Sequence, residues 1–184
     1  MSRGAGPVRQ LGLVVRDPDA AMRYWSDVLG IGPFFVNRHI RFEEFVYRGA
    51  PSPSPDVTLC FAQSGDLQIE IIAQHDDAPS AYRDFLAAGH EGVQHVAAWF
   101  DEDDTYRAAC LDLETRGLRL VHSGKAAGLD VCFAYYEGPG GGTPLLELAQ
   151  ATKPEVMAFA EMVAAAGARW DGRDPIRTMA GVPE

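Results

Sequence analysis

Residues 10–31, QLGLVVRDPDAAMRYWSDVLGI, hold a short apolar run and then a helix with clear start and stop signals. The run 10–15 is bounded by polar residues, which predicts a buried strand. Asp17 is placed to cap a helix, and Pro18 suits its first turn. Gly30 is typical of the position that ends a helix. The stretch therefore predicts a strand, a tight turn and an amphipathic helix.

The same signals predict the other elements of the chain. Apolar runs bounded by turn residues indicate further strands at 34–36, 42–47, 57–62, 67–73, 93–100, 118–121, 131–136 and 145–149. Further helices are predicted at 80–88, 105–117 and 154–166. We expect residues 50–55, APSPSP, to form a loop, because proline donates no hydrogen bond to a central strand. We expect the tail from Arg169 onward to be irregular.

The second half of the chain repeats the pattern of the first. Each half runs strand, acidic cap, helix and then several strands, and the same interval separates Gln10 from Asp19 and His95 from Asp104. Chance recurrence of strand–helix patterns is the alternative, but polar as well as apolar residues match, which favours duplication. The predicted parts are a first module at 8–75, a helical linker at 76–92, a second module at 93–150, and a C-terminal helix and tail at 151–184.

Four polar side chains recur at equivalent places in the two halves. Glu70 interrupts the apolar strand LQIEII, and Glu147 interrupts PLLELA. A carboxylate is costly to bury unless it is paired or bound to a metal, although a single strand Glu is more often solvated. With His95 and Gln10 they make a mixed nitrogen and oxygen set, which suits a divalent ion such as Zn, Co, Ni, Mn or Fe. We therefore predict one metal ion held by these four residues.

Composition and charge narrow the class of protein. The 184 residues are 47% hydrophobic and carry a formal net charge of −10, so binding to nucleic acid is not expected. No apolar run approaches the roughly 18 residues that a membrane helix needs. The polar start of the chain lacks a signal peptide, and the three cysteines form no C-x-x-C pair. We expect a cytoplasmic protein without membrane contact.

The chain resembles the glyoxalase, or vicinal-oxygen-chelate (VOC), superfamily over about residues 8–150. The matching stretches are residues 10–31, GVQHVAAWF at 92–100, LQIEII at 67–72 and LLELAQA at 145–151. Residues 80–96, SAYRDFLAAGHEGVQHV, are similar to the linker of methylmalonyl-CoA epimerases. The resemblance implies an α+β fold of two tandem βαβββ modules forming a pair of half-barrels, followed here by a C-terminal helix. It also implies metal ligands at Gln10, Glu70, His95 and Glu147.

The sequence departs from the epimerase pattern at two places. Epimerases usually have His at the position of Gln10, whereas glyoxalase I enzymes are known with Gln there. Epimerases are also thought to use a Glu just before the strand that starts at Val57, where this chain has APSPSP. Glu43 or Glu44 could take that role instead, although the alternative is that at least one of them is a solvated strand residue. Gln10 also argues against an extradiol dioxygenase, which binds Fe(II) through two His residues and one carboxylate.

The resemblance implies a metal-dependent isomerase or lyase that removes a proton next to a carbonyl group. The metal would act as a Lewis acid, and Glu147 or Glu70 as general base. The implied substrate is an acyl-CoA or a 2-oxoaldehyde adduct, bound by a homodimer. The alternative is a metal-free protein that sequesters a small molecule on the same fold.

Four further residues are candidates for binding the substrate. Arg38 and Arg41 belong to a small basic cluster in an otherwise acidic chain, which a phosphate or carboxylate of the substrate would favour. A solvated strand edge is the alternative for both. Trp99 shares a strand face with His95, and Tyr135 lies on a predicted strand of the second module. Core packing is the alternative for these two aromatic side chains.

Overall fold

The structure is a computed structural model that describes residues 6–142 and 144–178. The strands are β1 (Gln10–Val14), β2 (Phe34–Ile40), β3 (Phe42–Tyr47), β4 (Ala50–Pro51), β5 (Val57–Ser64), β6 (Leu67–Gln74), β7 (Gly92–Trp99), β8 (Arg119–Ala126), β9 (Cys132–Glu137), β10 (Leu145–Ala149) and β11 (Ile176–Thr178). The helices are α1 (Pro18–Asp27), α2 (Ala81–Ala87), α3 (Asp103–Thr115) and α4 (Pro154–Ala168). All strands join one sheet in the order β11-β2-β5-β6-β1-β7-β10-β9-β8-β3-β4.

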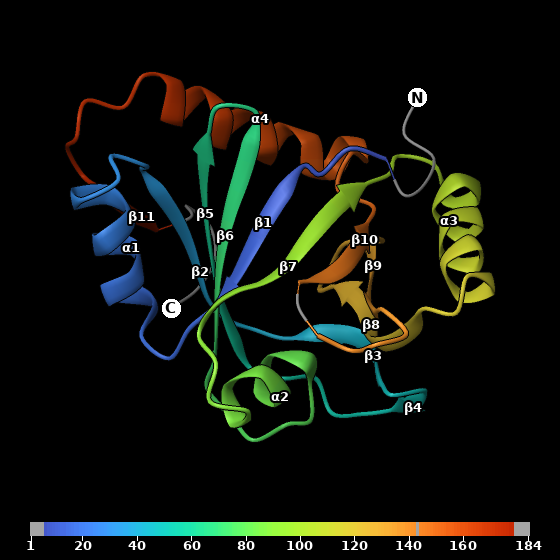
Figure 1. Ribbon diagram of the computed structural model, residues 1–184. Coiled ribbons are helices and arrows are strands. Elements are labelled where there is room, and N and C mark those ends of the chain that lie inside the picture. Colours follow the sequence, from blue (N-terminus) through green and yellow to red (C-terminus); the bar gives the residue numbers. More distant parts are fainter. Residues whose placement is uncertain (1–5, 143, 179–184) are drawn as a thin grey trace.

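Two runs of four neighbouring strands share one connectivity. In the first half β1 pairs in parallel with β6, and in the second half β7 pairs in parallel with β10. The two halves meet where β1 and β7 pair antiparallel at the middle of the sheet. In Figure 1, α1 lies at one side of the sheet and α3 at the other. The mixed α+β fold with a C-terminal helix is confirmed. This order supports the division at residues 76–92, which stays a prediction.

The start and stop signals of the first helix act as expected. Asp17 accepts a hydrogen bond from the backbone N–H of Ala20 at 2.9 Å and so caps α1. Gly30 follows the helix with a φ of +69°, a conformation that costs glycine little. Ser80 caps α2 in the same way, through the N–H of Arg83. The helix ends are therefore set by local sequence.

The place of strand β3 in the sheet does not follow from its position in the sequence. It belongs to the first half, yet it pairs antiparallel with β8 at the far edge of the second half. The proline-rich stretch forms only a two-residue edge strand, β4, which pairs with β3. An apolar pattern predicts that a segment is a strand but not which strand it pairs with. The pairing of β3 with β8 is therefore seen only in the tertiary structure.

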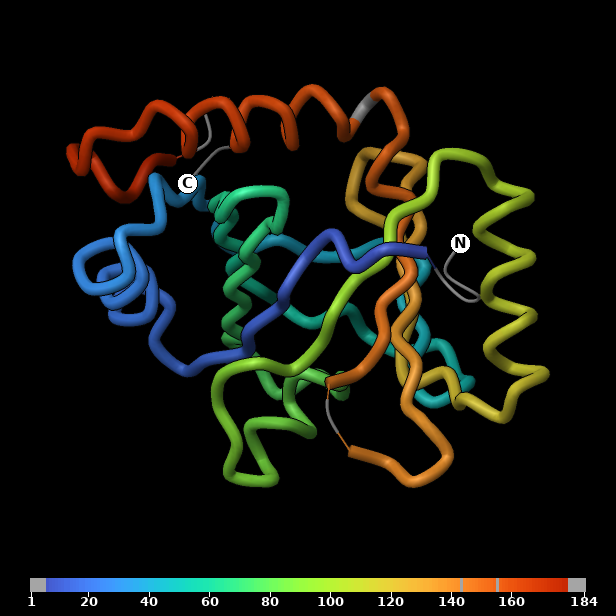
Figure 2. The backbone as a smooth tube through the Cα atoms, turned by 45° about the horizontal axis from the view of Figure 1, so that its top comes forward, coloured from blue at the N-terminus to red at the C-terminus, as the bar shows by residue number. Residues whose placement is uncertain are grey.

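The C-terminal segment contains a strand that the sequence analysis did not predict. Helix α4 forms as expected, but Ile176–Thr178 is strand β11 and not irregular chain. It pairs in parallel with β2 at the edge of the sheet. Three residues are too short for an alternating pattern to reveal, and the partner is distant in sequence. Figure 2 shows the segment after α4 turning back towards α1 and β2.

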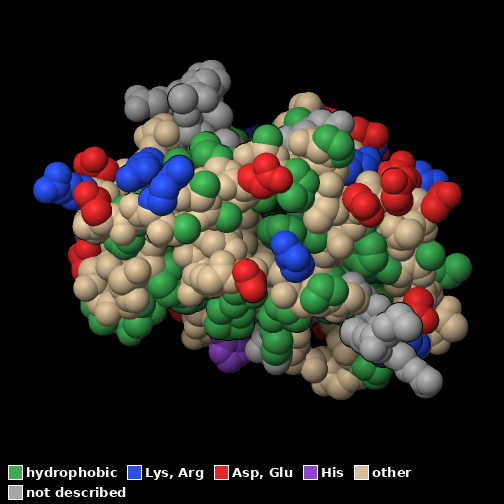
Figure 3. All heavy atoms as spheres, turned by 90° about the horizontal axis from the view of Figure 1, so that it is seen from above, with side chains coloured by type: hydrophobic (Ala, Val, Ile, Leu, Met, Phe, Trp, Pro, Cys, Tyr) green, Lys and Arg blue, Asp and Glu red, His purple; other side chains and the backbone are tan. Residues whose placement is uncertain are grey.

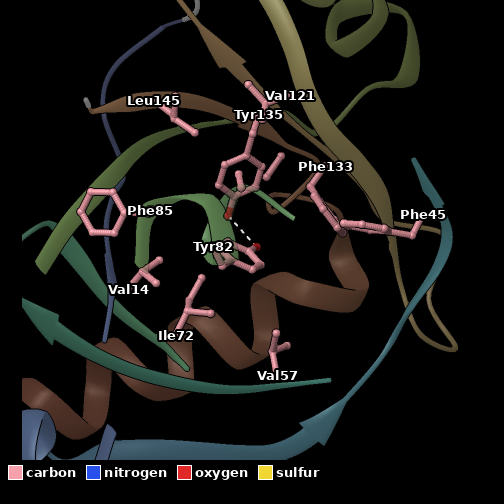
Figure 4. Packing of buried hydrophobic residues seen from close by; sticks show 12 residues of the cluster. Val14, Phe45, Val57, Ile72, Tyr82, Phe85, Val121, Phe133, Tyr135 and Leu145 are labelled. Carbon is pink, nitrogen blue, oxygen red and sulfur yellow. Dashed lines mark hydrogen bonds between the residues drawn. The ribbon is translucent and has the colours of Figure 1, made fainter. Parts of the chain in front are cut away.

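The central core cluster joins both halves of the chain. Val14 and Ile72 come from the first half, and Phe133 and Leu145 from the second, while Tyr82 of α2 packs among them. Figure 4 shows these side chains converging around one space. Two smaller clusters pack beneath α1 and α3. The central core is therefore built from both halves of the chain.

Two expectations from composition concern membrane helices and a signal peptide. No helix within residues 6–142 and 144–178 is long and apolar enough to cross a membrane. Residues 1–5, part of the start that we expect to lack a signal peptide, lie outside the described residues, and so do residues 179–184 of the tail.

Candidate metal centre

Three ionisable side chains that are far apart in sequence meet at the middle of the sheet. Glu70 lies on β6, His95 on β7 and Glu147 on β10, and all three are buried. The Nε2 atom of His95 is 3.3 Å from Oε2 of Glu70 and 3.3 Å from Oε2 of Glu147. One donor atom from each residue lies within 4.8 Å of the other two. The predicted convergence of these three side chains is therefore present in the structure.

A glycine makes room for the His95 ring. Gly12 on β1 is the register partner of His95 on β7. A Cβ atom at position 12 would lie 1.8 Å from Cε1 and 2.0 Å from Nε2 of the imidazole, far inside van der Waals contact. Only glycine therefore leaves the ring in this position. Sequence reasoning gave Gly12 no role.

A glutamine orients the same imidazole from the other side. Oε1 of Gln94, which is buried, lies 2.7 Å from Nδ1 of His95. An amide oxygen only accepts, so Nδ1 carries a proton and donates it here. In the neutral ring this leaves the lone pair on Nε2, the atom that faces Glu70 and Glu147. Sequence reasoning missed Gln94, because consecutive side chains of a regular strand point to opposite faces, whereas Gln94 lies where the pairing of β7 with β1 shifts its register.

Gln10, the fourth predicted ligand, is buried at the same site. Its Nε2 donates a hydrogen bond to Oε1 of Gln68 at 2.8 Å. The amide group is thereby oriented, and its Oε1 atom is left as a possible ligand. Gln10 and Gln68 line one cavity together with Glu70 and Glu147. The structure thus brings the four predicted ligands to one place, and Gln68 is an addition that sequence reasoning missed.

Burial and mutual charge shift the pKa values of the centre. Burial raises the pKa of Glu70, and the charge of Glu147 raises it further. Burial lowers the pKa of His95, but the two carboxylates outweigh it and raise that pKa to about 9. Without a metal the imidazole is therefore protonated at neutral pH. Binding a cation at Nε2 requires the loss of this proton.

Three oxygen atoms surround Nε2 of His95, a nitrogen that carries at most one proton. The hydroxyl of Tyr135 also lies 3.3 Å from Nε2, as the two carboxylate oxygens do. One ring nitrogen donates at most one hydrogen bond, and the buried Oε2 of Glu147 has no hydrogen-bond partner. Two buried carboxylates therefore share one imidazolium. One imidazole, two carboxylates and one amide oxygen are a donor set that a divalent metal fits, and the ion would balance their charge.

The centre opens on a cavity of about 160 Å³. Its walls come from both halves of the sheet, from α2 and from α4. Trp99 and Tyr135, two of the predicted substrate-binding residues, belong to the lining. Tyr82 donates a hydrogen bond from its hydroxyl to that of Tyr135 at 3.2 Å, and Figure 4 shows the two side chains pointing towards each other. Burial raises the pKa of both tyrosines well above the usual value.

The structure does not bring the other two predicted substrate-binding residues to this cavity. Arg38 binds Asp19 of α1 at 2.7 Å, and both side chains are exposed. Arg41 contacts Asp56 and Asp76, each at 3.4 Å. Neither arginine lines the cavity. Their charges are paired with acidic neighbours on the surface, which matches the alternative weighed for them.

The two carboxylates considered as a substitute base also lie elsewhere. Glu43 accepts a hydrogen bond from the backbone N–H of Gly128, and Glu44 pairs with Lys125 at 3.0 Å. Neither residue lines the cavity. Among the residues that the structure describes, Glu70 and Glu147 are the only carboxylates in its wall.

Comparison with known proteins agrees with this architecture. Residues 9–136 match the family model of the Glyoxalase/Bleomycin resistance protein/Dioxygenase superfamily. No curated protein matches the chain. Among solved structures, methylmalonyl-CoA epimerase from Mycobacterium tuberculosis is 21% identical, with a TM-score of 0.56 over 86% of this chain and 96% of the other.

Two further solved structures share the fold at lower identity. A variant of methylmalonyl-CoA epimerase from Streptomyces coelicolor, in complex with 2-nitronate-propionyl-CoA, is 17% identical with a TM-score of 0.51, over 78% of this chain and 92% of the other. A hypothetical protein from Bacillus halodurans is 15% identical with a TM-score of 0.52, over the same shares of the two chains. These likenesses establish the shared fold.

Proposed function

The chain belongs to the Glyoxalase/Bleomycin resistance protein/Dioxygenase superfamily, and from this premise we propose that it is a metal-dependent isomerase or lyase. The reaction removes a proton from the carbon next to a carbonyl group. The observation that carries the proposal is the buried His95 with two buried carboxylates 3.3 Å from its Nε2, at the wall of a cavity. Structural packing alone does not require such an arrangement, because it leaves negative charge poorly compensated.

The four predicted ligands have distinct parts in this proposal. Nε2 of His95, Oε1 of Gln10 and the carboxylates of Glu70 and Glu147 would hold one divalent ion, with Zn, Co, Ni and Mn as candidates. When bound, such an ion supplies Lewis-acid polarisation of the substrate's oxygen atoms. Gln94 fixes the orientation of the imidazole, and Gln68 that of the Gln10 amide. The amide of Gln10 adds no charge to the centre.

One of the two carboxylates takes the proton and returns it. Glu70 has a pKa raised by burial, which brings a carboxylate nearer to the range in which a general base is effective at neutral pH. Glu147 has a buried oxygen without a hydrogen-bond partner, so it too has an atom free to accept. The described part of the cavity wall offers no third carboxylate. The same residue therefore takes the proton and gives it back, or the two share the task.

The substrate class that we propose is inferred from the family and its solved neighbours and not from the geometry of the site. We propose an acyl-CoA or a 2-oxoaldehyde adduct, since the Streptomyces coelicolor neighbour is bound to 2-nitronate-propionyl-CoA. We further propose a homodimer in the cytoplasm, without nucleic acid as partner. The apolar cavity also favours a second candidate, a protein that sequesters a small molecule without metal. Metal content separates the two candidates.

The test is metal analysis followed by an exchange assay. We expect purified protein to hold about one equivalent of metal and His95→Ala to hold none. His90→Ala, an exposed histidine, is the matched control and should retain the metal. Metal-replete protein should then exchange deuterium into the acidic carbon of candidate acyl-CoAs or hemithioacetals. Wild-type protein that never binds stoichiometric metal would establish the sequestering protein instead.

A further inference from the structure

Helix α4 provides part of the cavity wall. Val156, Phe159 and Ala160 on one face of the helix line the cavity that also contains the metal-site carboxylates. The Phe159 ring meets Phe61 of β5 edge to face, with ring centroids 5.3 Å apart at 83°. One turn further along the same face, Val163 is completely buried. This face of α4 therefore packs like core and faces the substrate space.

Contacts with neighbouring elements hold both ends of α4. At its start, Lys153 binds Asp103 at 2.9 Å and donates to the backbone oxygen of Asp130 at 2.8 Å. Near its end, Gly167 approaches Gln63 of β5 so closely that an added Cβ would lie 3.3 Å from the backbone oxygen. Strand β11 then pairs with β2. The helix is therefore a fixed wall that sets the dimensions of the cavity.

The wall around the metal-site residues is apolar. Its large apolar side chains are Phe42, Leu59, Phe61, Trp99, Phe133 and Phe159. None of the lining residues that the structure describes is a lysine, arginine or histidine. The guanidinium of exposed Arg9 lies over the Trp99 ring, 5.4 Å from its centroid, and does not line the cavity. A charged group in the cavity would lose its water without gaining a counter-ion.

We propose that α4 and the aromatic wall select a substrate that carries an uncharged apolar group, aliphatic or aromatic, beside its metal-chelating oxygens. This inference rests on the metal centre proposed above and specifies the substrate class for that site. It disfavours acyl groups with a second, free carboxylate, because such a carboxylate would point into the apolar wall. Figure 3, seen from above α4, shows hydrophobic side chains at a hollow on this face, with charged side chains at its rim.

Three hydroxamic acids test the selection directly. Each binds a metal through the same chelating end, and calorimetry on zinc-loaded protein measures its Kd. Acetohydroxamic acid carries only a methyl group, benzohydroxamic acid a phenyl ring, and 4-carboxybenzohydroxamic acid the same ring with one carboxylate. We expect the phenyl compound to bind about tenfold more tightly than the methyl compound, because the ring is buried. The added carboxylate should cancel this gain.

Variants of α4 test the role of the helix. Phe159→Ala should abolish most of the tenfold preference for phenyl over methyl and leave the Kd of acetohydroxamic acid unchanged. Met162→Ala is the matched control, because Met162 lies on the same helix, is 43% exposed and does not line the cavity. It should leave all three Kd values unchanged. The comparison of the three compounds on wild-type protein does not depend on whether any variant folds.

Two results would overturn the inference while the proposed function survives. One is a carboxylated compound that binds as tightly as the phenyl compound. The other is a folded Phe159→Ala variant that keeps the full preference for phenyl. If zinc-loaded protein bound none of the three compounds, acetohydroxamic acid included, the metal centre itself would be at fault, and both proposals would fall.

Discussion

Gly12 is the residue on which the position of His95 depends most directly. The imidazole of His95 occupies the space that a Cβ at position 12 would need, because that Cβ would lie 1.8 Å from Cε1 of the ring. We predict that Gly12→Ala displaces the ring from Glu70 and Glu147 and weakens metal binding at least tenfold, the size of effect typical for residues that orient a ligand. Competition with a metal-binding dye measures the affinity.

A second glycine serves as control for that substitution. Gly140 has open space around its Cβ position, and its φ is not positive. Gly140→Ala should therefore leave the metal affinity as in wild type. An unchanged affinity in a folded Gly12→Ala protein would show that the imidazole is not the ligand we assign.

His122 is a buried histidine that the metal centre does not use. Burial, together with the positive charge of His95, lowers its pKa to about 3. The folded chain keeps it neutral, whereas the unfolded chain protonates it below its usual pKa of about 6.5. Its contribution to stability is thus complete above pH 6.5 and is lost as the pH falls towards 3. The loss is at most about 1.4 kcal/mol per pH unit.

We predict that His122→Asn flattens the pH dependence of the free energy of unfolding between pH 6.5 and 4. An asparagine oxygen can still accept the N–H of Ala81, which His122 Nδ1 accepts at 3.2 Å. Urea unfolding of metal-free protein at several pH values measures the slope. His90→Asn, a change at an exposed histidine, is the control. Equal slopes in wild type and His122→Asn would refute the assignment.

At the residue scale, the sequence predicted the donor atoms better than their surroundings. Glu70 and Glu147 stood out because they interrupt apolar strands, and Gln10 and His95 because they recur at equivalent places in the two halves. Gly12 did not, because its role depends on the register of β1 against β7, which shifts just after it. The alternation of side chains gives the face of a strand, whereas contacts across strands require the register.

At the scale of elements, α4 depends on a close approach to β5 near its C-terminal end. An added Cβ at Gly167 would lie 3.2 Å from Cβ and 3.3 Å from the backbone oxygen of Gln63. We predict that Gly167→Val forces α4 away from β5 and costs about 1–3 kcal/mol of stability. Helix propensity favours Val over Gly, so any loss reflects the contact. Thermal unfolding should show a Tm lower by several degrees.

The neighbouring residue provides the control for this element. Ala168→Val places the same side chain on the exposed side of α4, where it meets no strand. Its Tm should change by much less than that of Gly167→Val. Gly167→Val should also weaken benzohydroxamic acid binding and spare the metal. A Gly167→Val protein as stable as Ala168→Val would show that α4 tolerates displacement.

Elements with local signals were predicted, and elements that depend on distant partners were not. The cap at Asp17 and the glycine after α1 lie next to the helix that they limit. Strand β11 has three residues and forms because β2 offers an edge. Strand β3 was predicted as a strand, but it pairs with β8 near the opposite end of the strand order from β2, which precedes it in the chain. Arg38 and Arg41 likewise depend on acidic partners from other elements.

At the scale of the whole molecule, the proposed metal centre joins the two halves of the sheet. Gln10 and Glu70 come from the first half, and His95 and Glu147 from the second. The halves also meet through the β1–β7 and β3–β8 pairings and the central core. An ion held by all four residues therefore links the folding of one half to that of the other. It also compensates the carboxylates that the metal-free protein leaves to one imidazolium.

The last prediction concerns stability in the presence and absence of metal. A ligand that binds only the folded chain at one hundred times its Kd adds about 2.7 kcal/mol to the free energy of unfolding. For a chain of this size that corresponds to a rise in Tm of roughly 5–10 °C. We expect zinc to raise the Tm of chelator-treated wild type by this amount and His90→Ala equally, but not His95→Ala. An equal rise in His95→Ala would place the binding site elsewhere, whereas a rise lost in this variant alone ties the metal to the junction of the two halves.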